Sequence, residues 1–483
     1  NLENNTEQAI FSKKLATIIR DVPIELKIED IDSMDEENIP ELKKKLMKLE
    51  MKSILSKFKS DDETDECKAE VKNIDNIKEM KEVLLEVKDR IYIDYILKDA
   101  TTYSKIELEN LFLGEDNHGI VIDFKKIADE NHEEALAVLK ECMENESIKK
   151  TIHDGKNLVT FLRKNNINIK GFDFDTAIAA YLIDSSKSNY DIKELVNIYI
   201  GDNPSGEGIN FKGALSSYIP NIYNELKERL HKEDMDELYY TIEHPLIFVL
   251  SSMESIGFNI NADMLDELQV KFKKEIEETQ AEIYKLADEE FNISSPKQLG
   301  KILFEKLDLP VIKKTKTGYS TNQEVLEKLM DKHEIIPKIM YYRQITKINS
   351  TYVEGLKNVI DEDGRIHSNF NQTVTTTGRL SSTEPNLQNI PVRHEMGKEI
   401  RKVFIPFEKD DILVSGDYSQ IELRVPAHIA GDENMIDAFK HHSDIHTKTA
   451  SEVFKVPVEE VTSLMRSRAK AVNFGIVYGI SGF

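Results

Sequence analysis

The alternation of strand-like and helix-like apolar patterns between residues 90 and 184 constrains the fold of this chain more than any other feature. RIYIDYIL (90–97) and GIVIDF (119–124) are typical of β-strands. Helical spacing follows in EEALAVLKECM (133–143), KNLVTFLRK (156–164) and DTAIAAYLID (175–184). Strands that alternate with helices predict an α/β domain, which we place at residues 76–240.

Other patterns predict further parts on both sides of that domain. Residues 1–25 contain an apolar-periodic stretch, and residues 26–75 are rich in lysine and acidic residues, which is typical of a solvated linker. Long amphipathic patterns predict helices over residues 243–290. At roughly 100–200 residues per domain, a chain of 483 residues is expected to form three or four domains.

Composition narrows the class of protein. Hydrophobic residues make up 40% and charged residues 31%, as in soluble globular proteins. No run approaches the roughly 18 apolar residues of a membrane helix, and the start, NLENNTEQAI, does not resemble a signal peptide. The two cysteines, Cys67 and Cys142, can form neither a disulfide framework nor a Cys/His zinc cluster. We therefore expect a cytoplasmic protein that does not bind membranes.

The charge is distributed unevenly. The net charge of −24 disfavours nucleic acid as a partner when it is taken as a whole. The acidic excess, however, lies in residues 1–290, while residues 291–483 are close to neutral. Fields are screened within about 8 Å at physiological salt, so a distant acidic part does not prevent a neutral part from binding DNA.

The first motif that carries chemistry is ILVSGDYSQIELR (412–424). The apolar run Ile412–Val414 predicts a buried strand that places Asp417 at its end, and a helix is expected to begin near Gln420. A carboxylate at a strand end is a common metal ligand. The alternative is that Asp417 caps the helix.

The second motif is MRSRAKAVNFGIVYG (465–479), in which Arg466, Lys470, Phe474 and Tyr478 are each four residues apart. Such a row drifts only about 40° per step along one helix face. Two cations followed by two aromatic residues suit a polyphosphate at one end and a base or sugar at the other. The alternative is an ordinary amphipathic helix whose aromatic residues lie in a core.

Two further segments are candidate DNA contacts. TTTGRLSSTEPNLQNIPVR (375–393) predicts an irregular polar surface segment, whose donors Arg379 and Gln388 suit the minor-groove acceptors that nearly all base pairs share. KKTKTGYSTN (313–322) places Lys313, Lys314 and Lys316 among hydroxyl groups, which suits a phosphate backbone. For both segments, the alternative is a solvated loop.

Together and in this order, these motifs resemble those of the family A DNA polymerases of the bacterial polymerase I type. The resemblance rests on DYSQIELR, on the R-x3-K-x3-F-x3-YG helix and on TGRLSS-x2-PNLQNIP. SPKQLGKILFEKL (295–307) and KKTKTGYSTN are similar to the thumb of that family, and QITKINSTYVEGL (344–356) is similar to its thumb-to-palm passage. The N-terminal SKKLATIIRDVPIE (12–25) resembles the end of a 5′-nuclease domain.

The resemblance implies a multidomain α/β and α+β chain, with an RNase H-like exonuclease domain followed by the thumb, partial palm and partial fingers of a right-hand polymerase. The implied parts are a 5′-nuclease tail (1–25), a linker (26–75), a degenerate 3′–5′ exonuclease-like domain (76–240), a thumb (241–355), a partial palm (356–430) and partial fingers (431–483).

The implied activity is template-directed DNA synthesis in replication and repair, by two-metal nucleotidyl transfer with Mg²⁺. The implied partners are primer–template DNA and deoxynucleoside triphosphates, and we expect a monomer. Asp417 matches the first catalytic carboxylate and would bind metal together with the carbonyl of Tyr418.

The resemblance also implies the residues that contact substrates. Those that bind the nucleotide are Gln420, Glu422, His446, Arg466, Lys470 and Phe474. Those that bind DNA are Lys313, Lys314, Lys316, Lys347, Arg379, Asn386, Gln388, Asn389, Tyr478 and Gly479. Within these sets, Glu422 would exclude a ribose 2′-hydroxyl, while Arg466 and Lys470 would clamp the triphosphate.

The sequence departs from the family pattern in the carboxylates of polymerisation. The second catalytic carboxylate of the family lies in a His-Asp-Glu turn after the YG helix, and this chain stops at Phe483. We therefore expect a C-terminally truncated fragment that does not polymerise alone. The alternative function is a non-catalytic DNA-binding fragment.

Two other departures affect single residues. Pro426 stands inside the helix that carries Glu422, where proline costs about 3 kcal/mol, so a kink there would affect sugar discrimination. In the exonuclease-like domain, only Asp94 matches a metal-binding carboxylate, because Ile96, Leu158 and Ile222 replace the other three. We expect this domain to be inactive and to serve as a scaffold.

Overall fold

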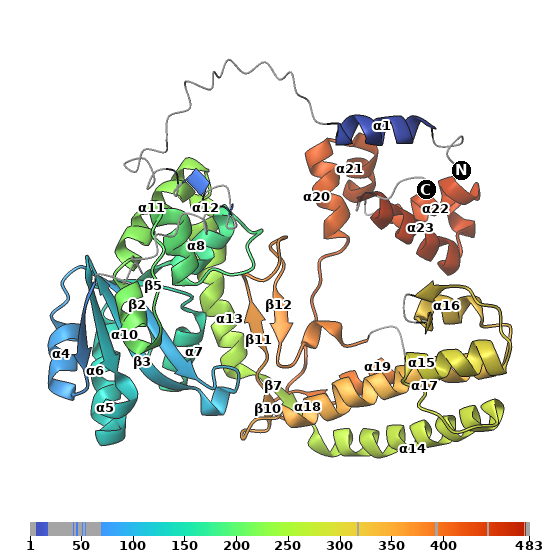
Figure 1. Ribbon diagram of the computed structural model, residues 1–483, viewed down its shortest axis with the longest axis horizontal. Coiled ribbons are helices and arrows are strands. Elements are labelled where there is room, and N and C mark those ends of the chain that lie inside the picture. The colour runs from blue at the N-terminus through green and yellow to red at the C-terminus, as the bar shows by residue number, and fades with distance from the viewer. Residues whose placement is uncertain are drawn as a thin grey trace. The chain divides into compact units, whose positions relative to one another are not determined.

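The computed structural model describes residues 6–17, 42, 45–46, 51, 54, 69–315, 318–391, 395–441, 444–477 and 479 (Figure 1). They divide into two compact units, Asn1–Phe407 and Glu408–Phe483, which we describe separately. Helices and sheets occur together, which confirms the predicted mixture of α and β structure. No helix in these described ranges is long and apolar enough to cross a bilayer.

A six-stranded mixed sheet forms the α/β part of the first unit. Its strands are β1 (Glu70–Ile74), β2 (Arg90–Lys98), β3 (Glu107–Glu115), β4 (His118–Asp123), β5 (Lys149–Ile152) and β6 (Phe172–Asp175), in the order β1-β4-β3-β2-β5-β6. β3 pairs antiparallel with β2 and β4, and the other pairs are parallel. The strands predicted at 90–97 and 119–124 are confirmed as β2 and β4. β1 occupies the end of the stretch predicted as a linker.

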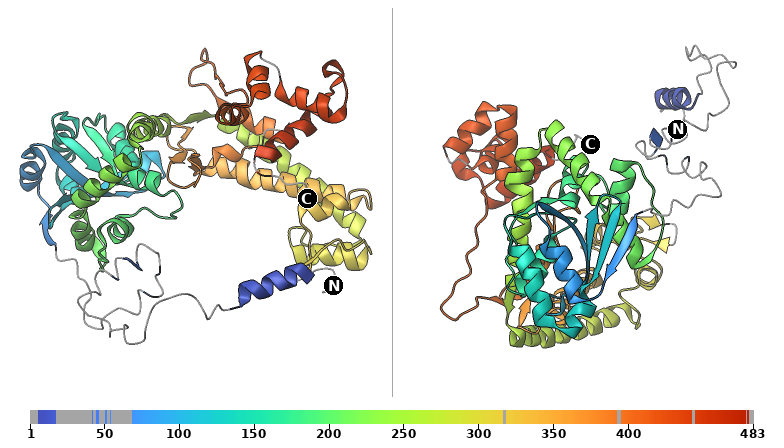
Figure 2. Two further views of the ribbon diagram at one scale, coloured as in Figure 1. Left: turned by 90° about the horizontal axis from the view of Figure 1, so that it is seen from above. Right: turned by 90° about the vertical axis from the view of Figure 1, so that its left-hand side faces the viewer.

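Helices surround this sheet (Figure 1, Figure 2). They are α4 (Ile77–Leu85), α5 (Phe124–Glu130), α6 (His132–Glu144), α7 (Lys156–Lys164), α8 (Thr176–Ile183), α9 (Ile192–Leu195), α10 (Gly208–Ser216) and α11 (Ile219–Lys232). The predictions of helices in 133–143, 156–164 and 175–184 are confirmed by α6, α7 and α8. At Gly119 of β4, an added Cβ would lie 1.9 Å from the carbonyl oxygen of Gly213, so glycine lets α10 approach the sheet.

Side-chain caps explain where several of these helices begin. Asp123, Asn131, Asp175 and Asp191 accept backbone N–H bonds at the first turns of α5, α6, α8 and α9. Such a cap satisfies donors that have no partner within the helix and contributes about 1 kcal/mol.

A helical part follows in the chain. Its elements are α12 (Asp236–Leu238), η7 (Tyr239–Glu243), α13 (His244–Ile256), β7 (Phe258–Ile260), α14 (Ala262–Ala287), α15 (Pro296–Lys301), η8 (Ile302–Lys306), β8 (Lys314–Thr315), β9 (Gly318–Tyr319), α16 (Gln323–Lys328), α17 (Ile335–Ile348), η9 (Asn349–Glu354) and α18 (Gly355–Asn358). α13 and α14 confirm the helices predicted over 243–290. Buried residues of α14, η8 and α17 share one apolar core.

Short strands complete the first unit. They are β10 (Arg365–Ile366), β11 (Asn369–Asn371), β12 (Ser381–Thr383) and β13 (Phe404–Ile405), with η10 (Leu387–Asn389) and α19 (Glu395–Arg401) between them. β7 pairs with β10 and β13, and β11 pairs antiparallel with β12. The segment 375–393 is therefore irregular, as predicted, apart from these short elements in its described residues.

Contacts distant in sequence join the α/β part to this later part. The Ser104 amide donates to Asp361 Oδ2 over 2.8 Å, and the Ser104 hydroxyl also donates to that carboxylate. The rings of Tyr103 and His367 stack with centroids 4.5 Å apart.

The second unit is helical. It contains α20 (Ile421–Ala430), α21 (Glu433–Lys440), α22 (Ile445–Phe454), η11 (Val458–Glu460) and α23 (Ser463–Val477). α20 confirms the helix expected near Gln420. The buried strand predicted at Ile412–Val414 is wrong, because residues 411–418 form neither helix nor strand, and Ile412 and Val414 are 80% and 84% exposed. A strand needs a pairing partner, and none of the strands in the described ranges pairs with this run.

His244 is a buried polar residue at the start of α13. It is 6% exposed and packs against the ring of Phe172 at 4.8 Å. Its Nε2 atom has no hydrogen-bond partner among the described residues. Burial lowers the pKa of His244 from 6.5 to about 4, although the charge of Asp173 partly opposes this shift.

We therefore predict that His244 makes the protein less stable as the pH falls from 6.5 to 4. In that pH range, His244 binds a proton in the unfolded chain but not in the folded chain. This difference lowers the free energy of unfolding by on the order of 3 kcal/mol. Replacing His244 with phenylalanine should remove this contribution. Urea unfolding of wild type and His244→Phe at several pH values measures it, and parallel stability curves for the two proteins would contradict the prediction.

Candidate functional site

One face of α23 carries the predicted row of cations and an aromatic residue. Arg466, Lys470 and Phe474 are exposed or half-buried on this helix, as their spacing predicts. The ammonium of Lys470 lies 5.6 Å from the centroid of the Phe474 ring. Tyr478, the last member of the row, lies outside the described residues. Gly479 is described, with a φ of 82° that suits glycine.

His446 joins α22 to this face. Its ring is 5.8 Å from that of Phe474, centroid to centroid, and its Nδ1 atom is 3.1 Å from the side-chain Nδ2 atom of Asn473. Burial lowers the pKa of His446, an effect that Asp444 opposes and the nearby cations reinforce. A neutral His446 therefore places a ring nitrogen beside Phe474 and two cations without adding charge.

Asp444 joins a cluster that contains Gln420, His446 and Arg466. It was not identified from the sequence. It caps α22 by accepting from the His446 amide at 3.1 Å, and it also accepts from the Thr447 hydroxyl at 2.7 Å. Arg466 donates to the same carboxylate, and Gln420 does so at 3.3 Å. Partial burial alone would raise the pKa of Asp444, but the bonds from Arg466 and Thr447 outweigh it and lower it to about 2.

A recognisable signal was present in the sequence. Aspartate directly before the helical pattern IHTKTA (445–450) is a standard N-cap. Its ion pair with Arg466 depends on tertiary structure and could not be predicted in that way.

The predicted metal ligands have a different environment. Asp417 lies in the exposed segment before α20, and Tyr418 is 80% exposed. No group of three His, Cys, Asp or Glu side chains in the described part of the chain could hold a metal ion. Among the described residues, Asp417 therefore has no group of neighbouring ligands with which it could share a metal ion.

α20 carries Glu422 in its first turn and Pro426 inside it. The helix continues to Ala430, so Pro426 does not end it. Because proline has no N–H, the carbonyl of Glu422 loses its usual helical partner.

The predicted DNA contacts at 375–389 lie in one exposed segment. The Thr375 hydroxyl donates to the Arg379 carbonyl at 2.6 Å, and Gln388 Nε2 donates to the Leu380 carbonyl at 3.2 Å. The side chain of Asn386 accepts from the Gln388 amide, and the Asn389 carbonyl accepts from a tyrosine hydroxyl. These bonds fix the backbone, while the side chains of Arg379, Asn386 and Asn389 are exposed.

A basic groove lies in the helical part of the first unit. It has a volume of about 1090 Å³, and its lining includes Lys297, Lys301, Arg343 and Lys347 beside several hydroxyl groups. Thr346 also lines the groove. Of the predicted residues, Lys347 lines this groove.

The lysines of 313–316 lie close to the groove in sequence. Lys314 is in β8, and its ammonium lies 5.7 Å from the ring centroid of Tyr319, which lines the groove. Lys313 is exposed, and Lys316 lies outside the described residues.

The exonuclease-like site can be located through Asp94. This residue lies in β2, and with His153, Asp154 and Asp191 it lines a cavity of about 550 Å³. Burial raises the pKa of Asp94, with His153 opposing.

The three positions expected to lack carboxylates are apolar. Ile96 is in β2, while Leu158 and Ile222 are 0% and 1% exposed in the apolar core around the sheet. Side chains buried in that way can supply no metal ligand.

Two segments of the chain match known families. Residues 262–483 match DNA polymerase family A, and residues 95–228 match the ribonuclease H-like domain of DNA polymerase I.

Curated relatives and a solved structure agree with these matches. The chain is 41% identical to a protein named DNA polymerase I from Bacillus subtilis, over all of this chain and 56% of that protein. It is 39% identical to the DNA polymerase I of Geobacillus stearothermophilus, again over all of this chain and 56% of the relative. The chain thus spans about half the length of these relatives. The POL domain of Pol1 from M. smegmatis, in complex with DNA primer-template and dNTP, has 32% identity and a TM-score of 0.74, over 86% of this chain and 72% of that one.

We predict that Asp444 stabilises α22 by capping the helix. We also predict that its negative charge stabilises the cluster by pairing with Arg466. Asp444→Ala should destabilise α22 by about 1–2 kcal/mol, because the cap and the pairing with Arg466 are both lost. Asp444→Asn retains a capping oxygen and should cost less. Hydrogen exchange of peptides from residues 445–454 measures both variants, and equal losses would show that capping is not the cause.

Proposed function

Because the chain belongs to family A of the DNA polymerases, we propose that it acts in template-directed DNA synthesis, in replication and repair, on a primed template and deoxynucleoside triphosphates. The observation that carries this proposal is the face of α23, where Arg466 and Lys470 precede Phe474 on one side of the helix. A triphosphate requires cations, and a base or sugar requires an aromatic surface at a fixed distance from them.

In this proposal, each member of the cluster has a distinct task. Arg466 and Lys470 bind the phosphates, and Phe474 stacks on the nucleoside. His446 contacts a phosphate as a neutral donor and supports the ring of Phe474. Asp444 orients the guanidinium of Arg466 and fixes the side chain of Gln420. Glu422, in the first turn of α20, excludes a ribose 2′-hydroxyl.

DNA is held by two surfaces of the first unit. We propose that the groove with Lys297, Lys301 and Lys347 binds the phosphate backbone, together with the lysines of 313–316. The exposed segment with Arg379, Asn386, Gln388 and Asn389 senses the minor groove. Tyr478 and Gly479 would complete the contact at the template base.

Membership of the family implies a divalent metal cofactor, and we propose Mg²⁺. Asp417 and the Tyr418 carbonyl would supply ligands, and the ion would stabilise the attacking and leaving oxygens. The second candidate function is DNA binding without catalysis by residues 1–483. It is favoured by the absence, among the described residues, of any group of three His, Cys, Asp or Glu side chains that could hold a metal ion.

The cellular setting is also a proposal. The buried, free Cys142 suits a reducing cytoplasm. We propose that the protein acts there as a monomer.

We predict that Arg466→Ala weakens nucleotide binding whereas Arg468→Ala does not. Arg468 is an exposed arginine two positions further along α23, which turns it away from the face of Lys470 and Phe474. The assay is the stabilisation of a labelled primer–template complex by the correct deoxynucleoside triphosphate, read as fluorescence anisotropy. Arg466→Ala should cost about tenfold in apparent affinity, as for a charged hydrogen bond. If both variants lost the same apparent affinity, the effect would be explained by the change in net charge and not by the position of Arg466.

Primer extension distinguishes the two candidate functions. With Mg²⁺ and all four deoxynucleotides, we expect residues 1–483 to bind the primed template without extending it, because no group of three His, Cys, Asp or Glu side chains among the described residues could hold a metal ion. Extension that disappears in Asp417→Ala would overturn this expectation and would establish catalysis by this chain. Failure of the wild-type protein to bind primer–template at any salt concentration would refute both functions.

We predict no 3′–5′ exonuclease activity. Asp94 is the one matching carboxylate, and Leu158 and Ile222 are buried among apolar side chains. Labelled single-stranded DNA incubated with Mg²⁺ or Mn²⁺ should stay intact. Stepwise shortening from the 3′ end that is lost in Asp94→Ala would contradict this prediction.

A further inference from the structure

The exonuclease-like part of the chain makes hydrogen bonds to the segment that carries Arg379. The Tyr181 hydroxyl in α8 donates to the Thr375 carbonyl at 2.7 Å and accepts from the Gly378 amide at 3.1 Å. One hydroxyl thereby closes both ends of the turn directly before Arg379. Tyr181 is 2% exposed, so its position is fixed by the core around it.

Neighbouring groups reinforce this contact. The Ser185 hydroxyl donates to the Thr376 carbonyl at 3.0 Å. The Thr375 hydroxyl donates to the Arg379 carbonyl, which tightens the same turn from within. Gly378 has a φ of 77°, a conformation that costs glycine little and lets its amide reach Tyr181.

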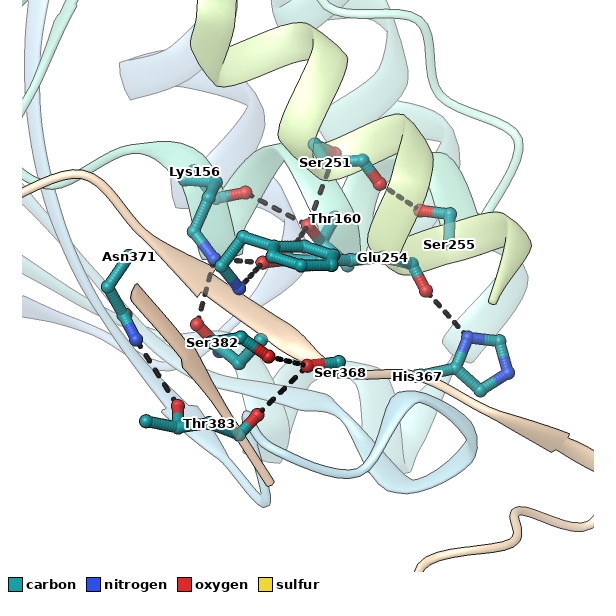
Figure 3. Close-up of polar contacts among 12 residues, drawn as sticks. Lys156, Thr160, Ser251, Glu254, Ser255, His367, Ser368, Asn371, Ser382 and Thr383 are labelled. Carbon is teal, nitrogen blue, oxygen red and sulfur yellow. Dashed lines mark hydrogen bonds and ion pairs between the residues drawn. The ribbon is translucent and has the colours of Figure 1, made fainter. Parts of the chain in front are cut away.

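A buried ion pair fixes the base of the same segment (Figure 3). Lys156 of α7 pairs with Glu254 of α13, and their side chains are 9% and 7% exposed. Glu254 also accepts from the Phe370 amide at 2.8 Å, and Lys156 donates to the Asn369 side chain at 3.0 Å. Phe370 and Asn369 both lie in β11, which pairs with β12. The ion pair therefore helps to position β12, the strand that precedes residues 386–389.

We infer that Tyr181 is a positioning residue for DNA binding: through its hydroxyl, the exonuclease-like part holds the turn 375–378 so that Arg379 is presented to the primer–template. The inference rests on the proposed function, because it requires that Arg379 contact DNA. It gives the degenerate domain a task that needs no metal and no carboxylate.

The test compares two tyrosine-to-phenylalanine variants that each remove one hydroxyl from neighbouring rings. Tyr181 and Tyr190 pack edge to face, with centroids 5.8 Å apart. The Tyr190 hydroxyl donates to the Asp184 carbonyl at 2.7 Å, within the exonuclease-like part. Tyr190→Phe is therefore a matched control that removes a buried hydroxyl without touching the turn.

Binding of a labelled primer–template is measured first. Tyr181→Phe should weaken it about three- to tenfold, the range expected for net loss of one or two hydrogen bonds, whereas Tyr190→Phe should bind like wild type. A double-mutant cycle then tests whether Tyr181 acts through Arg379. In an Arg379→Ala background, the effect of Tyr181→Phe should fall below about twofold.

Hydrogen exchange gives a readout that does not depend on DNA. Peptides covering residues 372–381 should exchange faster in Tyr181→Phe, while peptides from β2–β6 should be unchanged. Failure of the wild type to bind DNA would remove the proposed function, whereas exchange would still report whether Tyr181 orders the turn.

Three results would overturn the inference. They are wild-type affinity in Tyr181→Phe, equal weakening in Tyr190→Phe, and additive effects of Tyr181→Phe and Arg379→Ala. If Tyr181→Phe does not fold, Ser185→Ala tests the same turn through its bond to Thr376. It should weaken binding about twofold to threefold, and unchanged binding there would likewise contradict the inference.

Discussion

The buried pair of Lys156 and Glu254 is the interaction on which the arrangement of the first unit depends. Removing two charges from water costs several kcal/mol for each ion, and this cost is recovered only when the charges are paired and their remaining polar atoms are hydrogen-bonded. Thr160 and the Phe370 amide supply those additional bonds. Helices α7 and α13 and strand β11 must therefore come together at the same point, since any one of them displaced would leave a charge buried without a partner. The position of the proposed DNA-contacting segment follows from this constraint.

In the second unit, the carboxylate of Asp444 also connects several elements, but it is more exposed to solvent than Glu254. Asp444 connects α20, α22 and α23 through Gln420, its own helix cap and Arg466. The side chains of Asp444 and Arg466 are 31% and 44% exposed, so solvent and salt weaken their attraction. A pair of this kind orients a guanidinium without binding it permanently. This property suits the phosphate binding that we propose for Arg466, whereas the pair of Lys156 and Glu254 suits a permanent contact.

Features of the structure could be predicted from the sequence where their physical cause lies within a few neighbouring residues. The strands β2 and β4, the helices α6–α8 and the face of α23 follow from periodicities within a few residues, and all were predicted. Ile412–Val414 was wrongly predicted as a buried strand. Its apolar residues indicate burial, but a strand forms only where a neighbouring strand pairs with it. β1 was missed since EVKNI is a mostly exposed edge strand with little apolar signal. The partners of Asp444, Lys156 and Tyr181 lie 22, 98 and 194 positions away, and no pattern in one sequence reveals such pairs.

The bonds between Ser104 and Asp361, and the stacked rings of Tyr103 and His367, have a consequence for how such proteins evolve. They connect positions on either side of what the sequence divides into an exonuclease-like module and a polymerase module. If this domain lacks its own chemistry, as we propose, it would ordinarily be free to be deleted or exchanged by recombination. Here its surface residues are complementary to one particular partner within the same chain, so an exchanged module would arrive without those matching groups. These contacts would then favour retention of the domain whatever its chemistry, and they would constrain its contact positions more tightly than its catalytic positions.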